Sequence, residues 1–147
     1  MDIVSYPNLS NRPYSLQVER EMEVSIDVLY HAWTEGFGSW FAAPDSVIME
    51  AKVNSVFFFE TEFNEMRHPH YGRFLKLEQN RLVEITWITA GTKSETVVTV
   101  EFVSKDHGVM IKLTHAGFSD ELSRDQHEEA WPYVLEQLDK RMKETTK

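Results

Sequence analysis

Alternating apolar and polar positions fill most of the chain between residues 14 and 115, and this period of two is typical of half-buried β-strands. The first run starts at Tyr14 and carries Arg20 on the same face as its apolar residues. Further runs cover residues 55–63, 70–89 and 94–115, and turn-forming residues around Asn80 and Gly108 divide the last two into hairpins. Short hairpin connections favour an antiparallel sheet.

Helical spacing replaces this alternation after the first strand. Ser25 has the chemistry of an N-cap, and apolar residues follow it at helical spacing as far as Trp33. Gly36 and Gly38 are expected to end that helix, and residues 39–44 predict a second short one.

The C-terminal region predicts a long amphipathic helix. Ser123, with Gln126 three residues later, fits a capping box. The apolar stripe of this helix consists of His127, Trp131, Val134, Leu135, Leu138 and Met142. Five carboxylates mostly fall off the stripe, and they are Asp125, Glu128, Glu129, Glu136 and Asp139. The first three are interpreted as the solvated start of the helix.

These elements predict a single α+β domain over residues 14–147, preceded by an extended lead-in over residues 1–13. A sheet of about six or seven strands needs a cover for its apolar face, and the long helix is the natural one. A curved sheet that grips one helix tends to leave a space between the two.

The chain has 147 residues, a net charge of −9 and no cysteine. The acidic surface disfavours nucleic acid and anionic membranes as partners, and the lack of cysteine excludes disulfides and thiolate chemistry. No apolar run approaches the roughly 20 residues that cross a bilayer, and the N-terminus lacks a signal-peptide pattern. We therefore expect a cytoplasmic protein.

Three stretches resemble the helix-grip superfamily, which includes START lipid-transfer domains, the major birch-pollen allergen and polyketide cyclases. They are "VEREMEVSIDVLYHAWTE", "GRFLKLEQNRLVEITW" and the segment over residues 98–142 with its Thr-His-x-Gly-Phe step. Within the superfamily, residues 14–144 are most similar to homologues of the activator of the heat-shock protein 90 ATPase. The resemblance implies a curved antiparallel sheet wrapped around a long C-terminal helix. It says less about function, because this scaffold hosts carriers, cyclases, hydrolases and chaperone regulators.

His115 and Arg20 are the polar candidates for chemistry. Strand parity directs His115 inward, where it would bind or protonate a buried ligand or be satisfied by backbone groups of the loop. Arg20 would receive a ligand anion, or pair with a strand carboxylate such as Glu60 or Glu84, or lie half in water at the end of the sheet. His127 and Glu128 lie about 100° apart around the helix, so no metal site is expected.

The leading hypothesis is a protein that binds a small hydrophobic molecule, aromatic, polyketide-like or lipid-like, between the sheet and the last helix. The predicted ligand-binding residues are Arg20, Trp40, Phe41, Phe57, Phe59, Trp87, His115, Trp131 and Leu135. Alternatives are regulation of a heat-shock protein 90 type chaperone through surface contacts, and a cyclase or hydrolase with His115 as acid–base. We expect no cofactor, and a monomer or weak dimer.

Overall fold

The computed structural model describes residues 4–89 and 94–145, and its centre is one six-stranded sheet. The strand order is β1-β6-β5-β4-β3-β2, and every neighbouring pair is antiparallel. Strands that follow one another along the chain pair as neighbours, while β1 joins the sheet beside the last strand. The strands are β1 (Tyr14–Met22), β2 (Val56–Phe63), β3 (Met66–Glu78), β4 (Leu82–Thr89), β5 (Thr96–Lys105) and β6 (Gly108–Phe118).

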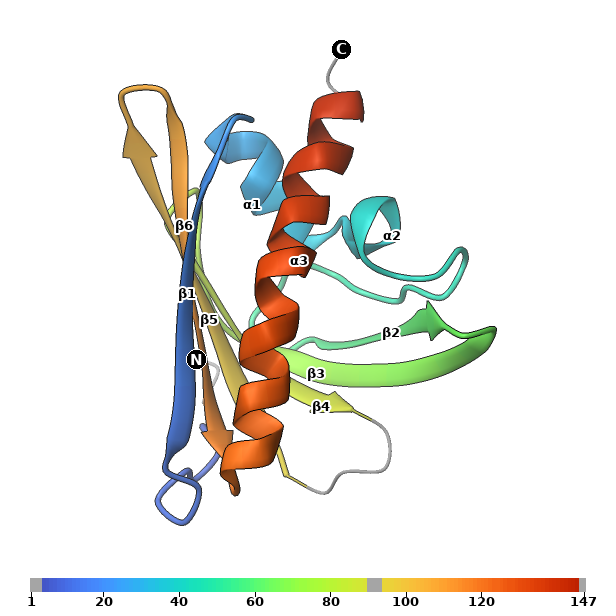
Figure 1. Ribbon diagram of the computed structural model, residues 1–147, viewed down its shortest axis with the longest axis vertical. Helices are drawn as coiled ribbons and strands as arrows, with labels where there is room; N and C mark the ends of the chain where they lie inside the picture. Colours follow the sequence, from blue (N-terminus) through green and yellow to red (C-terminus); the bar gives the residue numbers. More distant parts are fainter. Residues whose placement is uncertain (1–3, 90–93, 146–147) are drawn as a thin grey trace.

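The long helix α3 (Glu121–Thr145) lies across the concave side of the sheet, along β1 and β6 (Figure 1). The short helices α1 (Ile26–Thr34) and α2 (Phe37–Trp40) follow β1 and pack at the C-terminal half of α3 (Figure 1). This arrangement confirms the predicted helix-grip fold with two short helices after the first strand.

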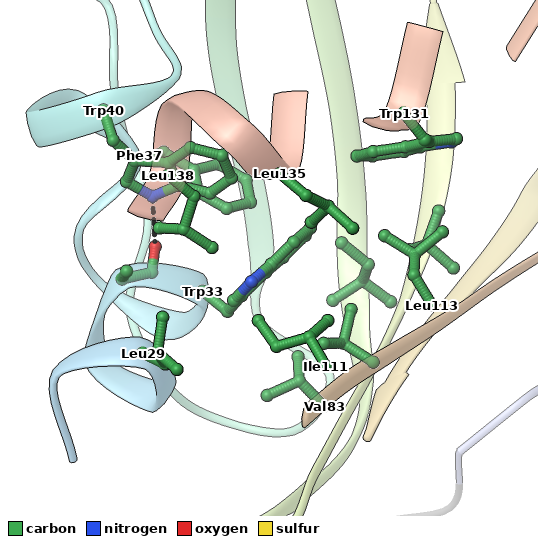
Figure 2. Packing of buried hydrophobic residues seen from close by; sticks show 14 of the residues in the cluster. Leu29, Trp33, Phe37, Trp40, Val83, Ile111, Leu113, Trp131, Leu135 and Leu138 are labelled. Atoms are coloured by element: carbon green, nitrogen blue, oxygen red, sulfur yellow. Dashed lines mark hydrogen bonds between the residues drawn. The ribbon is translucent and has the colours of Figure 1, made fainter. Parts of the chain in front are cut away.

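The alternating pattern explains the core. Phe57 and Phe59 of β2 are buried, as are Val98 and Val100 of β5 and the odd-numbered residues 109–115 of β6. The helix stripe meets them, since Trp131, Leu135, Leu138 and Met142 are all buried. Figure 2 shows Trp33 of α1 between Leu135 above it and Ile111 and Val83 below it. The apolar stripe predicted for α3 and the inward direction predicted for His115 are therefore confirmed.

Two helix starts differ from the prediction. Helix α1 ends at Thr34, before the two glycines as predicted, but helix α2 begins at Phe37 and contains Gly38, two residues earlier than the predicted start at residue 39. Helix α3 begins at Glu121, and the carboxylate of Asp120 accepts a hydrogen bond from the backbone N–H of Ser123 at 2.7 Å. Asp120 thus caps the helix where Ser123 was predicted to, because a carboxylate earlier in the chain already satisfies the free amide.

Asp139 lies off the apolar stripe of α3 but is only 2% exposed. It lies on the flank of the helix that packs against β1, where its carboxylate accepts the backbone N–H of Glu23 at 3.0 Å. Lys143 and Arg20 lie 3.5 and 3.8 Å from the same carboxylate. The partner of Arg20 is therefore on the covering helix, and the expectation of a strand partner such as Glu60 or Glu84 was wrong.

Candidate functional site

A pocket of about 260 Å³ opens at the end of the grip where α3 begins. It is partly open to solvent. The ends of β4, β5 and β6 form one wall, and the first turns of α3 form the other. The lining residues are Trp87, Thr89, Ser94, Thr96, Gly117, Phe118, Ser119, Asp120, Ser123 and His127. Apolar rings thus face a rim of hydroxyl, carboxylate and imidazole groups, a mixture typical of small-molecule sites.

A β-bulge at Gly117 shapes this wall. Tyr14 pairs with Phe118 but Ser15 pairs with Ala116, so Gly117 is an extra residue on β6. Its φ of +101° is a conformation that side chains rarely adopt, and an added Cβ would lie 2.8 Å from Leu9 Cδ2. The bulge resets strand parity, so that His115 and Phe118 both point inward with ring centroids 4.5 Å apart. The Thr-His-x-Gly-Phe step in the sequence is this bulge.

His115 lies directly behind the pocket and is fully buried. The indole N–H of Trp131 donates to its Nδ1 at 3.1 Å. The hydroxyl of Thr96 lies 2.8 Å from its Nε2 and donates to the backbone carbonyl of Trp87 at 2.7 Å. Since the Thr96 proton is used on the carbonyl, the imidazole must donate from Nε2. The result is a chain of three hydrogen bonds that links α3, β6, β5 and β4 and leaves no nitrogen of His115 free.

Burial lowers the pKa of His115 well below its usual value, and the neighbouring imidazole of His127 lowers it further. The imidazole is therefore neutral at physiological pH. This geometry bears on the predicted role of His115 in binding or protonating a ligand. A role in positioning Trp131 and Thr96 fits it, whereas proton exchange with a ligand would first require one of the two hydrogen bonds to break.

His127, in the second turn of α3, lines the pocket. Its Nδ1 lies 2.8 Å from the backbone carbonyl of Ser123. Its ring packs against Phe118 and His115, with centroid distances of 4.9 and 5.1 Å. The sequence pattern assigned His127 to the edge of the helix stripe and gave it no function.

The structure brings together all the predicted ligand-binding residues except Arg20, which lies at the β1–α3 contact described above. Trp87 is the centre of the group, with ring centroids 5.9 Å from Phe41, 5.5 Å from Phe59 and 5.5 Å from Trp131. Phe57, Trp40 and Leu135 belong to the same buried cluster. These side chains pack against one another and fill the space between sheet and helix. Trp87 is the member of the predicted set that also lines the pocket.

Sequence reasoning missed Thr96, Phe118 and His127 as parts of the site. Thr96 pairs with Trp87, and this pairing follows only from the β4–β5 register. Phe118 points inward only because of the bulge. Across residues 4–89 and 94–145, no three His, Asp or Glu side chains come together in a way that would hold a metal ion.

The curved sheet, the covering helix and the site at the open end of the grip define a helix-grip domain. The chain belongs to the family described as activator of Hsp90 ATPase homolog 1-like protein, whose family model matches residues 23–143. No curated protein matches the chain in sequence.

Solved structures share the fold at low sequence identity. Protein MLL2253 from Mesorhizobium loti is 18% identical, with a TM-score of 0.76 over 90% of this chain and 98% of that one. CalU16 from Micromonospora echinospora is 18% identical, with a TM-score of 0.70 over 87% and 75%. The Aha1 dimer from Colwellia psychrerythraea, solved in solution, is 19% identical, with a TM-score of 0.69 over 88% and 96%. Within the described ranges, no helix is long and apolar enough to cross a membrane.

Proposed function

We propose that this domain binds a small, mainly aromatic molecule in the pocket between the β4–β6 strand ends and the start of α3. The observation that carries the proposal is the pocket itself, in which Trp87 and Phe118 meet the polar rim of Asp120, Ser123 and His127. Sites for drug-sized ligands usually enclose roughly 300–1,000 Å³. A pocket of about 260 Å³ therefore suits a compact molecule of one or two rings more than a long lipid.

The surroundings of the pocket support this function. The hydrogen bonds of His115 to Trp131 and Thr96, and that of Thr96 to the Trp87 carbonyl, hold these groups in fixed positions behind it, so the wall is pre-organised. Pre-organisation reduces the entropic cost of binding.

The test is a thermal-shift screen of small aromatic and lipid-like compounds, followed by the same measurement on Ser123→Leu. This change fills the pocket and keeps the two backbone hydrogen bonds of residue 123. A ligand at ten times its Kd should stabilise the wild type by about 1.4 kcal/mol, and Ser123→Leu should lose that gain. Ser104→Leu, on the exposed surface of β5, is the matched control and should keep it. Equal stabilisation of all three proteins would place the ligand elsewhere and overturn the proposal.

A second candidate function is regulation of a heat-shock protein 90 type chaperone, supported by the family match and by an exposed apolar row. Ile48 pairs with Phe58, and Phe58 pairs with Tyr71, so the three share the outer face at the edge of the sheet. Ile48 is 70% exposed, and the nearby Val56 on β2 is 66% exposed. Apolar surface of this kind marks interaction sites.

The chaperone candidate predicts that a purified chaperone of this type retains the protein in a pull-down and changes its ATPase rate. The double variant Ile48→Ser/Val56→Ser should weaken both effects. Val103→Ser, which changes an exposed residue of β5, should not. If the wild type is not retained at low salt, this candidate fails. A monomer or weak dimer is proposed for either function.

The cyclase or hydrolase alternative has the least support from the geometry. It requires His115 to exchange protons with a substrate, yet this side chain is fully buried and both its nitrogens are hydrogen-bonded within the protein.

A further inference from the structure

The orientation of His127 determines what it offers a ligand. The carbonyl oxygen of Ser123, 2.8 Å from Nδ1, is able only to accept, so Nδ1 carries the proton. In the neutral ring Nε2 is then a bare acceptor. Among the residues that the structure describes, Nε2 has no hydrogen-bond partner. Phe118 and His115 pack against the ring and hold it in this orientation.

The rest of the pocket rim also favours a hydrogen-bond donor over an anion. Of the residues that the structure describes, no lysine or arginine lines the pocket, whereas the carboxylate of Asp120 does. That carboxylate already occupies the start of α3, the position where a helix would otherwise attract a ligand anion. The hydroxyl of Thr96 donates its hydrogen bond to the Trp87 carbonyl and has no proton left for a ligand. The nearby Arg124 is bound to Asp125 and to the backbone of Ser15.

We infer that the pocket selects neutral aromatic molecules that carry a hydroxyl group, and that Nε2 of His127 accepts the hydroxyl hydrogen. The ring of such a phenol-type ligand packs between Trp87 and Phe118, the two large apolar groups of the lining. This inference rests on the proposed function, since it assumes that the pocket takes a small aromatic molecule. It makes His127 the specificity-determining residue of the site, with His115 behind it as a positioning residue.

The test compares three molecules that share one methyl-substituted ring. Para-cresol carries a hydroxyl, para-methylanisole replaces it with a methyl ether that is unable to donate, and para-toluate replaces it with a carboxylate. Dissociation constants are measured at neutral pH by NMR titration. A hydrogen bond of ordinary strength makes para-cresol bind about 3- to 10-fold more tightly than the ether. The carboxylate should bind more weakly than para-cresol.

The same titrations on His127→Phe separate the hydrogen bond from ring packing, because phenylalanine keeps the ring and removes the acceptor. This variant should bind para-cresol and the ether equally. His107→Phe, in the exposed turn between β5 and β6, is the matched control and should keep the preference. The comparison of ligands on the wild type alone also tests the inference if His127→Phe fails to fold.

The outcomes distinguish the inference from the proposed function. If the wild type binds para-cresol and the ether equally, or prefers the carboxylate, the inference is overturned while the proposed function stands. If no single-ring or two-ring aromatic compound binds the wild type, the proposed function fails and the inference fails with it.

Discussion

Acidification should destabilise this protein through His115. Burial keeps the folded-state pKa of this imidazole well below about 6.5, the value of an exposed histidine. Between those two pKa values the unfolded chain binds one more proton than the folded one. The free energy of unfolding therefore falls as the pH drops below about 6.5, and the part due to His115 is fully present above that pH.

The magnitude follows from the linkage. One proton corresponds to about 1.4 kcal/mol for each pH unit, so His115 removes up to about 2 kcal/mol between about pH 6.5 and about pH 5. Burial also lowers the pKa of His70, which stacks on Phe59 at 5.0 Å and adds to the same slope. The total is a large fraction of the roughly 5–15 kcal/mol that stabilises a typical domain.

The assay is urea unfolding, followed by tryptophan fluorescence, at several values between about pH 7.5 and about pH 5. His115→Gln should be less stable than wild type at neutral pH, because its amide does not reproduce both hydrogen bonds. Its stability should nevertheless depend less steeply on pH, by up to about 1.4 kcal/mol per unit. His107→Gln, which removes an exposed histidine, should keep the wild-type slope. Equal slopes for wild type and His115→Gln would refute the account of a buried neutral imidazole.

Three further changes have defined outcomes, each measured as the free energy of unfolding in urea. Trp40→Phe should cost about 1 kcal/mol more than Trp33→Phe. The indole N–H of Trp40 donates to the Ala32 carbonyl at 2.9 Å (dashed line in Figure 2), whereas the indole N–H of Trp33 has no partner within the described residues. Equal losses of stability in the two variants would contradict this expectation. Gly117→Ala should cost about 1–3 kcal/mol through strain at positive φ. Gly38→Ala, where an added Cβ lies 3.6 Å from Val47, is the control and should change stability little. If Gly117→Ala is as stable as the wild type, the role given to the bulge is wrong. Asp139→Ala should cost about 1–3 kcal/mol. Asp139→Asn should cost less, because its amide oxygen still accepts the Glu23 N–H. If both variants lose the same stability, the ion pairs with Arg20 and Lys143, and not this hydrogen bond, account for the stabilisation by Asp139.

The fold was predictable because local patterns determine it. Period-two alternation in the strands indicates one buried face of the sheet, and the stripe from Trp131 to Met142 indicates one buried face of the helix. A six-stranded sheet and one long helix can bury both apolar faces in few ways, and the simplest is to pack them against each other. The burial of Asp139 was not predictable from that stripe. It depends on Arg20 of β1 and on the backbone N–H of Glu23, the residue after β1, which both lie at the flank of α3.

The position of the pocket depends on details that the alternation of apolar and polar residues does not reveal. Inward aromatic residues predict an apolar interior, but only side-chain volumes decide whether that interior is hollow, and here the rings around Trp87 fill it. The remaining space lies where the Gly117 bulge turns Phe118 inward and where α3 begins three residues later. His115 was recognised by strand parity, whereas His127 gains its importance from the backbone carbonyl that fixes its tautomer.

The most direct test of the central claim is a two-dimensional NMR titration that follows the four tryptophan indole N–H signals during addition of para-cresol. Trp87 lines the pocket, while Trp33, Trp40 and Trp131 are buried in the interior. We expect the Trp87 signal to shift most, Trp131 to respond weakly through His115, and Trp33 and Trp40 to stay in place. A titration in which Trp33 and Trp40 shift as much as Trp87 would place the ligand deep between sheet and helix, and the proposed pocket would be wrong.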